Sequence, residues 1–453
     1  MERIYIGDLQ GYVGKEATIK GWVDVRRNQG KMVFFDFRDM TGKVQGVVLP
    51  GNAEALEVSK DIRPEWVVEI TGKVNKRPDK NVQADKQNGD IELEVLSINI
   101  LSRAKELPFE KDVEINLDTY LDALPFTLRT DKSQAVFKIQ ATIMRAYREF
   151  LTSQKFTEFN SPKLIGDDAE GSGEVFKVPY FYEKTAHLAT SPQLYKQIMV
   201  GVFERVFAIG NVFRAEKHST ARHLNEYTSM DLEMGFITDH HDIMNMETEL
   251  MRHIMGQLEQ HAAKEFALLG ASIPVIPAQI PFMKLREAQE LIFKETGKDK
   301  RTEPDLEPED ERWLCEWSKK THDSDFVFVT HYPVSKRPMY TYEDENDKGF
   351  TKSFDLLFRG LEITTGGQRV HDYDLLIEKI KAKGLDPEKF AFYLQAFKYG
   401  MPPHGGLGMG LERLTAKLLG LDNVKQATLF PRDINRIDTL LSSSQDVHNS
   451  KSA

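Results

Sequence analysis

Residues 205–236 read RVFAIGNVFRAEKHSTARHLNEYTSMDLEMGF, and this stretch decides how the larger part of the chain folds. Two largely apolar runs flank a loop that is rich in arginine and histidine, which predicts a β-hairpin. Arg214 can bind an oxyanion through two parallel hydrogen bonds, and His223 can donate a further one, so the loop can hold a polyphosphate. The segment Phe213–Glu216 taken alone better fits an ordinary surface hairpin.

The segments around this hairpin alternate between strand-like and helical patterns. Strand-like runs follow at DFVFVTHYP and FDLLFRGLEITTG, and helical spacing appears at residues 133–154, 240–268 and 284–296. This mixture predicts an α+β domain over residues 131–437, in which helices flank an antiparallel sheet.

The first hundred residues predict a small β-barrel instead. Five short runs of alternating or apolar residues are separated by turn signals such as NQGK, MTGK and QNGD. Five strands in this length match an OB-fold, which we expect over residues 1–103, although another small β-domain would show the same pattern.

Three segments lack a clear period. Residues 104–130 contain Pro108 and Pro125 with scattered acids, and we interpret them as a hinge. The run KDKRTEPDLEPEDERW lies in an insertion at 297–325 and reads as solvated surface, while residues 438–453 read as a disordered tail.

Composition excludes several classes of protein. The formal net charge is −10 over 453 residues, so the chain does not coat nucleic acid through bulk charge, although a local basic face is compatible with that total. Cys315 is the single cysteine, which excludes an internal disulfide framework and a cysteine-based zinc cluster. The sequence shows neither a secretory signal pattern nor an apolar run of about 18 residues, so we expect a cytoplasmic protein without a membrane span.

A second segment with chemical character reads GGLGMGLERL from Gly405 to Leu414. Its glycines permit close backbone approach, and GLERL begins a helix whose first turn carries Arg413, where it can face an anion. The segment is neither a Walker loop nor a dinucleotide-binding fingerprint, because it lacks their lysine and their βαβ context.

Three elements in this order carry a resemblance to a known family. The helix leading to Pro162, the Phe213–Glu216 loop with HLNEY after it, and the glycine-rich GLERL segment resemble motifs 1, 2 and 3 of class II aminoacyl-tRNA synthetases. With the barrel in front, the chain is similar over roughly residues 15–435 to the aspartyl, asparaginyl and lysyl subgroup. The resemblance implies ATP-dependent activation of an amino acid, transfer to tRNA, an anticodon-binding OB domain and a homodimer.

Two further segments resemble the aspartyl type, in its archaeal and eukaryotic form without a large extra domain. Ser191–Gln197 reads SPQLYKQ and Gly366–His371 reads GGQRVH, although Thr190 stands where glutamine is common. By this resemblance Lys196 and Arg369 hold the side-chain carboxylate of L-aspartate. An asparagine site should not bury two cations against a neutral amide, yet an asparaginyl enzyme stays the rival. Alone, Lys196 could be a helix-surface lysine and Arg369 a strand-edge charge.

The resemblance assigns the remaining residues one by one. Arg214 and Arg413 act in catalysis, and the aspartate contacts beyond the two cations are Glu170, Gln193 and Asp231. The ATP contacts besides those two arginines are Glu216, Arg222, His223, Leu224, Tyr227, Glu362 and Gly410. Asp355 and Glu362 hold Mg²⁺, and Arg26, Phe34 and Gln45 contact the anticodon, although Phe34 could equally belong to the barrel core.

The magnesium pair raises a question of geometry. Asp355 and Glu362 are seven residues apart, which is an odd spacing for one face of a strand. We therefore expect a turn or bulge at Arg359–Gly360 that resets the register.

Two other classes of function are weighed against an active synthetase. A non-catalytic RNA-binding relative should have lost motif arginines or metal acids, and a small-molecule ligase of the same ancestry commonly lacks the barrel. Neither loss is seen. The sequence leaves open whether the partner is tRNA(Asp) alone or tRNA(Asn) as well.

Overall fold

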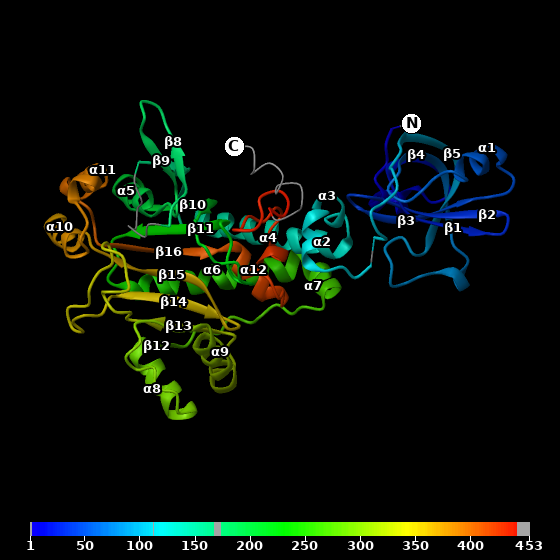
Figure 1. Cartoon of the computed structure of the whole chain (residues 1–453). Coiled ribbons are helices and arrows are strands. Elements are labelled where there is room, and N and C mark those ends of the chain that lie inside the picture. Colours follow the sequence, from blue (N-terminus) through cyan, green and yellow to red (C-terminus); the bar gives the residue numbers. More distant parts are fainter. Residues whose placement is uncertain (1, 112, 167–173, 442–453) are drawn as a thin grey trace. The chain divides into compact units, whose positions relative to one another are not determined.

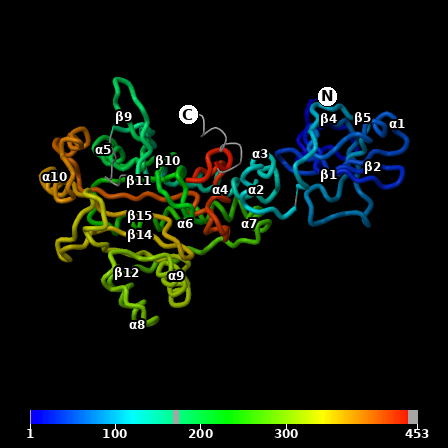
Figure 2. The backbone as a smooth tube through the Cα atoms, viewed as in Figure 1, coloured from blue at the N-terminus to red at the C-terminus, as the bar shows by residue number. Residues whose placement is uncertain are grey.

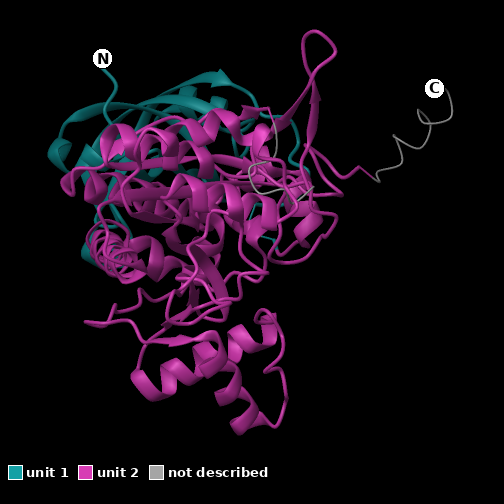
Figure 3. Ribbon diagram, turned by 90° about the vertical axis from the view of Figure 1, so that its left-hand side faces the viewer, with its two compact units in different colours: residues 1–113 teal, residues 114–453 magenta. Residues whose placement is uncertain are grey.

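The computed structural model describes residues 2–111, 113–166 and 174–441. The chain divides into two compact units, residues 1–113 and 114–453 (Figure 3).

The first unit is a closed five-stranded barrel, as predicted. Its strands follow the order β1-β2-β3-β5-β4, and β3 pairs with β5 in parallel while the other neighbours are antiparallel. Alternate residues such as Phe35 and Phe37 point inward and are fully buried. The elements are η1 (Ile6–Tyr12), β1 (Glu16–Gln29), β2 (Met32–Asp39), β3 (Gly42–Val48), α1 (Ala53–Ser59), β4 (Val67–Lys76), η2 (Asp79–Asn81) and β5 (Ile91–Ser102).

The second unit is built on an eight-stranded sheet in the order β12-β13-β14-β15-β16-β11-β10-β6 (Figure 1). The strands are β6 (Thr157–Glu158), β10 (Arg205–Phe213), β11 (Glu226–Gly235), β12 (Phe282–Lys284), β13 (Phe326–Thr330), β14 (Ser353–Phe358), β15 (Leu361–Arg369) and β16 (His404–Gly410). A separate three-stranded sheet holds β7 (Leu164–Ile165), β8 (Lys177–Pro179) and β9 (Thr185–Leu188).

The large sheet is mixed, whereas the sequence predicts an antiparallel one. Its six central strands are antiparallel, but β6 pairs with β10 and β12 pairs with β13 in parallel. Long crossover segments that contain helices connect each parallel pair, and a parallel pairing requires such a connection.

The helices α4, α6, α7 and α12 lie together on one face of this sheet. The helix α6 packs against β15 and β16, and α4 packs against α6, α7 and α12. Figure 2 shows α4, α6 and α7 as neighbours. The helices of this unit are α2 (Leu117–Asp122), α3 (Leu124–Thr127), α4 (Asp131–Ser153), α5 (Gln193–Phe203), α6 (His240–His261), α7 (Ala263–Leu269), α8 (Leu285–Thr296), α9 (Pro308–His322), α10 (Tyr373–Ala382), η3 (Pro387–Phe390), α11 (Ala391–Lys398), α12 (Leu411–Leu419) and η4 (Val424–Ala427). Among the described residues, no helix is both long enough and apolar enough for a membrane span.

The segment expected as a hinge holds more regular structure than its sequence pattern predicts. The expected hinge at 104–130 contains α2 and α3, and residues from Glu114 onward belong to the second unit. The buried Arg436 pairs with Asp118 and Asp122, a tertiary contact that holds α2 and that no local pattern signals. The expected tail at 438–453 lies outside the described residues beyond Leu441.

The insertion at 297–325 is also more than solvated surface. It contains the whole of α9, which begins inside the charged run and buries Asp310, Glu311 and Leu314. The sequence pattern does not reveal this helix, because its mean hydropathy is low and charged residues occupy part of its buried face.

Candidate active site

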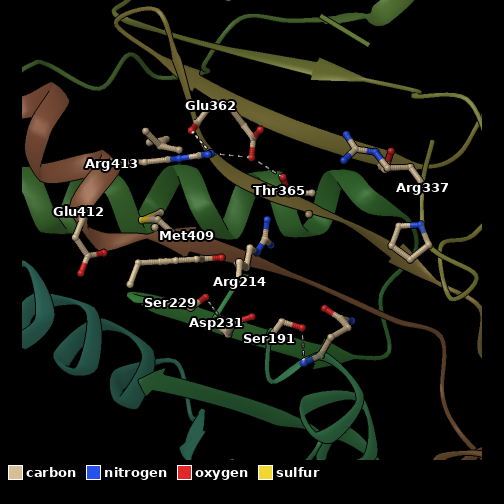
Figure 4. Close-up of a pocket in the computed structure, with 18 of the residues that line it drawn as sticks. Ser191, Arg214, Ser229, Asp231, Arg337, Glu362, Thr365, Met409, Glu412 and Arg413 are labelled. Carbon is tan, nitrogen blue, oxygen red and sulfur yellow. Dashed lines mark hydrogen bonds and ion pairs between the residues drawn. The ribbon is translucent and has the colours of Figure 1, made fainter. Parts of the chain in front are cut away.

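A cavity of about 360 Å³ opens over the face of the large sheet opposite α6. The β10–β11 hairpin, β15, β16 and the first turn of α12 contribute its walls. Figure 4 shows Arg413 and Glu362 pointing toward one another, with Asp231 beside Ser229 on another part of the lining. The predicted site residues that line the cavity are Gln193, Arg214, Glu216, Arg222, His223, Leu224, Tyr227, Asp231, Glu362, Arg369, Gly410 and Arg413.

Four charged side chains form a buried network at one end of the cavity. The Lys196 ammonium lies 2.9 Å from Asp231 and 3.3 Å from Glu233, and Arg369 Nε lies 2.9 Å from the same Glu233. The four residues are at most 5% exposed. Two cations thus face two carboxylates, which is how proteins retain buried charges.

Glu233 is the member of this network that the sequence analysis missed. Burial alone would raise the pKa of the Glu233 carboxyl group, but the nearby cations Arg369 and Lys196 lower it below its ordinary value. Glu233 lies two residues after Asp231 on β11, so both side chains point to the same face of the sheet. That spacing was the signal that could have found it.

The glycines of β16 make room for these acids. A Cβ atom on Gly406 would lie 2.1 Å from a Glu233 carboxylate oxygen, and one on Gly408 would lie 3.1 Å from Asp231. Gly406 pairs with Glu233 and Gly408 pairs with Asp231 across β11 and β16. The glycine-rich segment therefore permits charge burial here as well as a close approach to a ligand.

Lys196 lies below the cavity and does not line it. Its ammonium also donates to the Leu407 carbonyl at 2.8 Å, so its three donors already have partners. Arg369, in contrast, reaches the cavity while it donates to the Gly406 carbonyl at 2.9 Å. The expectation that both cations touch one ligand therefore requires Lys196 to exchange a partner.

The other end of the cavity carries cations on the hairpin loop and on α12. Arg214 lies 5.7 Å from the Tyr227 ring centroid and 3.8 Å from Glu216. The Asn225 amide donates to the carbonyls of Arg214 and Glu216 at 2.6 and 3.1 Å, so it sets the shape of this loop. Burial lowers the pKa of His223, and Arg413 adds to that effect while Glu216 opposes it.

The insertion helix α9 reaches the same end through Glu311. Its carboxylate accepts a hydrogen bond from Arg222 at 2.7 Å. Burial raises the pKa of Glu311 to about 7, because the nearby Arg222 only partly offsets the loss of water. No local pattern predicts a role for Glu311, since 89 positions separate the two partners.

Asp355 and Glu362 lie on neighbouring strands, which explains their odd spacing. The chain turns at Arg359–Gly360, where both residues have positive φ, and the register shifts after Leu356. Asp355 Oδ2 accepts from Arg337 at 2.7 Å, while Glu362 accepts from the Thr365 hydroxyl at 2.9 Å. The expected turn is present, and a bulge accompanies it.

The oxygen atoms of this region suit a hard cation. Glu362 and Thr365 line the cavity, and Asp355 Oδ1 is buried without a hydrogen-bond partner among the described residues. Burial raises the pKa of Asp355 to about 6, with Glu362 adding to that effect and Arg337 opposing it. Carboxylate and hydroxyl oxygens with room for waters are what Mg²⁺ prefers.

The barrel residues lie in the other unit, and Glu170 lies outside the described residues. Phe34 and Gln45 are partly exposed, whereas Phe35 and Phe37 fill the barrel core. Phe34 lies opposite Arg27 across β1 and β2, and Gln45 lies opposite Asp36 across β2 and β3. These four residues therefore occupy nearby positions on three adjacent strands. Arg26 donates to the Ser59 carbonyl at 3.0 Å. A core role for Phe34 is thus excluded, and contact with an anticodon stays a prediction.

Sequence comparison decides the family. Residues 116–434 match tRNA synthetases class II (D, K and N), and residues 17–101 match the OB-fold nucleic acid binding domain. The chain belongs to the class II tRNA synthetases. The predicted combination of an OB-fold barrel with a class II synthetase domain is confirmed.

Relatives of this class II synthetase cover nearly its whole length. A Thermus thermophilus protein named aspartate–tRNA(Asp/Asn) ligase is 46% identical over 439 residues, which are 96% of this chain and 99% of the relative. A Thermoplasma acidophilum protein named aspartate–tRNA(Asp) ligase is 39% identical over 442 residues, 96% of this chain and 100% of the relative.

Among solved structures, asparaginyl-tRNA synthetase from Pyrococcus horikoshii with asparaginyl-adenylate superposes with a TM-score of 0.89 at 31% identity. The match covers 96% of this synthetase and 99% of that chain. A backbone this similar to an asparaginyl enzyme leaves the choice of amino acid to the side chains of the cavity.

Proposed function

We propose that this chain is an aspartate–tRNA ligase, which activates L-aspartate with ATP and transfers it to the 3′ end of tRNA(Asp). The observation that carries the proposal is the buried network of Lys196, Arg369, Asp231 and Glu233 at one end of the cavity. The relatives named as aspartate–tRNA ligases support it. Because one relative acts by name on tRNA(Asp/Asn), tRNA(Asn) is a second candidate acceptor.

In the amino-acid subsite, opposite charges recognise the two ends of aspartate. Asp231 faces the cavity and can accept from the α-ammonium, and Gln193 lies beside it in the lining. Arg369 presents its guanidinium to the side-chain carboxylate, and Lys196 adds positive charge from below. Because Asp231 then pairs with the α-ammonium, a neutral asparagine amide would leave the two buried cations with Glu233 as their remaining carboxylate, which costs binding free energy.

In the first step, an oxygen of the aspartate α-carboxylate attacks the α-phosphorus of ATP. The bond from that phosphorus to the bridging β-phosphate oxygen breaks, and pyrophosphate leaves with the electron pair. Arg214 and Arg413 can neutralise charge that develops on the phosphates, and Tyr227 can stack on the adenine. The reaction requires no side-chain nucleophile, because alignment and charge neutralisation suffice.

Glu362, Thr365 and Asp355 would hold Mg²⁺ beside the phosphates. The ion would supply positive charge that offsets the phosphate oxygens.

In the second step, a terminal ribose hydroxyl of tRNA attacks the carbonyl carbon of aspartyl-adenylate. The carbon–oxygen bond to AMP breaks, and an ester to tRNA forms. On the barrel, Phe34 can stack on an unpaired anticodon base while Gln45 and Arg26 offer polar contacts.

We also propose that the enzyme is a cytoplasmic homodimer that forms through the segment around Pro162, where Leu164 is 48% exposed.

The proposal is tested with the purified full-length chain. Pyrophosphate exchange with aspartate, asparagine and lysine identifies the activated amino acid, and charging of purified tRNA(Asp) and tRNA(Asn) identifies the acceptor. We expect exchange with aspartate alone and charging of tRNA(Asp). Exchange that depends on asparagine instead would establish the asparaginyl alternative. Sedimentation measures the oligomeric state.

A further inference from the structure

A chain of buried hydrogen bonds leads away from the amino-acid end of the cavity. Gln193 and Gln197 lie one turn apart on α5, Tyr393 lies on α11 and His404 begins β16. The Gln193 amide nitrogen lies 3.0 Å from Gln197 Oε1, and the Tyr393 hydroxyl lies 3.2 Å from the same oxygen. Gln197 Nε2 lies 3.0 Å from His404 Nε2. These four residues are at most 5% exposed.

The tautomer of His404 decides which atom donates and which accepts in each of these hydrogen bonds. His404 Nδ1 lies 2.9 Å from the Pro402 carbonyl, which can only accept, so Nδ1 carries the hydrogen. In a neutral imidazole Nε2 is then an acceptor, and the Gln197 amide nitrogen must donate to it. Burial lowers the pKa of His404 to about 4, so the ring is neutral at physiological pH.

The orientation of the Gln197 amide fixes the orientation of Gln193 in the cavity lining. Since its nitrogen faces His404, Gln197 presents its oxygen to Gln193 and Tyr393, and both of these donate to it. The Gln193 nitrogen is thereby directed away from the cavity, and its carbonyl oxygen is the atom that remains for a ligand. The Gln193 backbone N–H also lies 3.2 Å from Ser191 Oγ, which further anchors the residue.

We propose that His404 and Gln197 are positioning residues that point the Gln193 carbonyl oxygen at the α-ammonium of the bound amino acid. The inference rests on the proposed function only in requiring an amino-acid substrate. The α-ammonium is common to aspartate, asparagine and lysine, so whichever amino acid supports exchange in the wild type serves for the test. If the enzyme activates an amino acid other than aspartate, this inference can therefore still be tested separately.

Two substitutions of Gln197 separate orientation from packing. Gln197→Met removes the acceptor, so Gln193 loses its fixed direction. We expect the KM for the amino acid to rise at least about tenfold while the KM for ATP stays unchanged, since a hydrogen bond to a charged group is lost. Gln197→Glu keeps both acceptor contacts, and a protonated His404 can donate to the new carboxylate. We expect its amino-acid KM within about threefold of the wild type.

A purely structural role predicts the reverse order, because Glu buries a charge and Met does not. Equal KM values for the two variants, or a higher value for Gln197→Glu, would overturn the proposal. The matched control is Gln289→Met on α8, which removes another buried glutamine that donates to the Glu303 carbonyl at 2.8 Å. We expect this control to leave the amino-acid KM unchanged.

A second measurement does not depend on how the Gln197 variants fold. NMR of the ¹⁵N-histidine-labelled full chain, assigned with His404→Asn, reports which ring nitrogen carries the hydrogen. We expect the Nδ1–H form between pH 6 and 8. An Nε2–H form would reverse every link and refute the proposal.

Discussion

The two ends of the cavity differ in how much water reaches their charged groups. At the end proposed for the amino acid, Lys196, Asp231, Glu233 and Arg369 are at most 5% exposed and pair at 2.9 to 3.3 Å. At the end proposed for the nucleotide, the side chains of Arg214, His223 and Arg413 are 29 to 40% exposed, and the ion pairs they make are 3.6 to 3.9 Å long.

This difference separates two uses of charge. A buried network is organised before the ligand arrives, and removal of one member leaves an uncompensated charge in a medium of low polarity. Exposed pairs contribute little to stability, so phosphates can replace them at small cost. We therefore expect substitutions at the nucleotide end to affect activity alone, and substitutions at the amino-acid end to affect activity and stability together.

The largest effect on activity is expected at the nucleotide end. Arg214→Ala should lower aspartate-dependent pyrophosphate exchange about a thousandfold, because a cation aimed at developing phosphate charge is lost. Its free energy of unfolding should stay within about 0.5 kcal/mol of the wild type, since the side chain is 40% exposed. Near-normal exchange would remove Arg214 from the mechanism. The control is Arg301→Ala, a similarly exposed arginine outside the cavity.

The buried end should respond differently. Lys196→Met should raise the KM for aspartate about a hundredfold and leave the KM for ATP unchanged, because Asp231 and Glu233 lose a shared cation. Chemical denaturation should show a loss of about 3 kcal/mol in the free energy of unfolding. Equal losses for aspartate and ATP, or unchanged stability, would argue that the two ends do not differ as described.

A buried acid on the other face of the sheet gives a pH-dependent test. Burial raises the pKa of Glu247 on α6 to about 8, with Asp355 adding to the effect. The folded state therefore binds this proton more tightly than the unfolded state, and stability falls as pH rises from about 4.5 through 8. Relative to Glu247→Gln, the wild type should lose about 1.4 kcal/mol per pH unit in that window. Parallel stability curves for the two proteins would show that Glu247 titrates normally.

The smallest effect is expected from Glu311→Gln on α9. If Arg222 binds ATP phosphates as proposed, the Glu311 carboxylate competes with them for it, and its pKa of about 7 means that it is ionised at pH 8 and largely protonated at pH 6. The variant should therefore lower the KM for ATP about threefold at pH 8 and leave it unchanged at pH 6. The exposed Glu316→Gln on the same helix is the control. A raised KM for ATP at pH 8 would show that Glu311 orients Arg222 instead of competing for it.

Local patterns were enough to predict most of the architecture. The five strands of the barrel and the β10–β11 hairpin each lie in one continuous run of sequence, so alternation and turn residues reveal them. The two edge pairings of the large sheet escaped prediction, because strands of two or three residues carry too little pattern to specify a parallel partner. The helix α9 escaped because tertiary contacts bury its acids.

By itself, the sequence determined that a barrel precedes an α+β domain, and that a hairpin loop and a glycine-rich segment each carry cations. Those features depend on neighbours in the chain and on residue type. Only the tertiary structure decided that Glu233 lies between Lys196 and Arg369, that Glu311 contacts Arg222, and that Lys196 lies under the cavity floor. Charge pairing and access to water depend on which distant segments meet, because burial is a property of the packed fold.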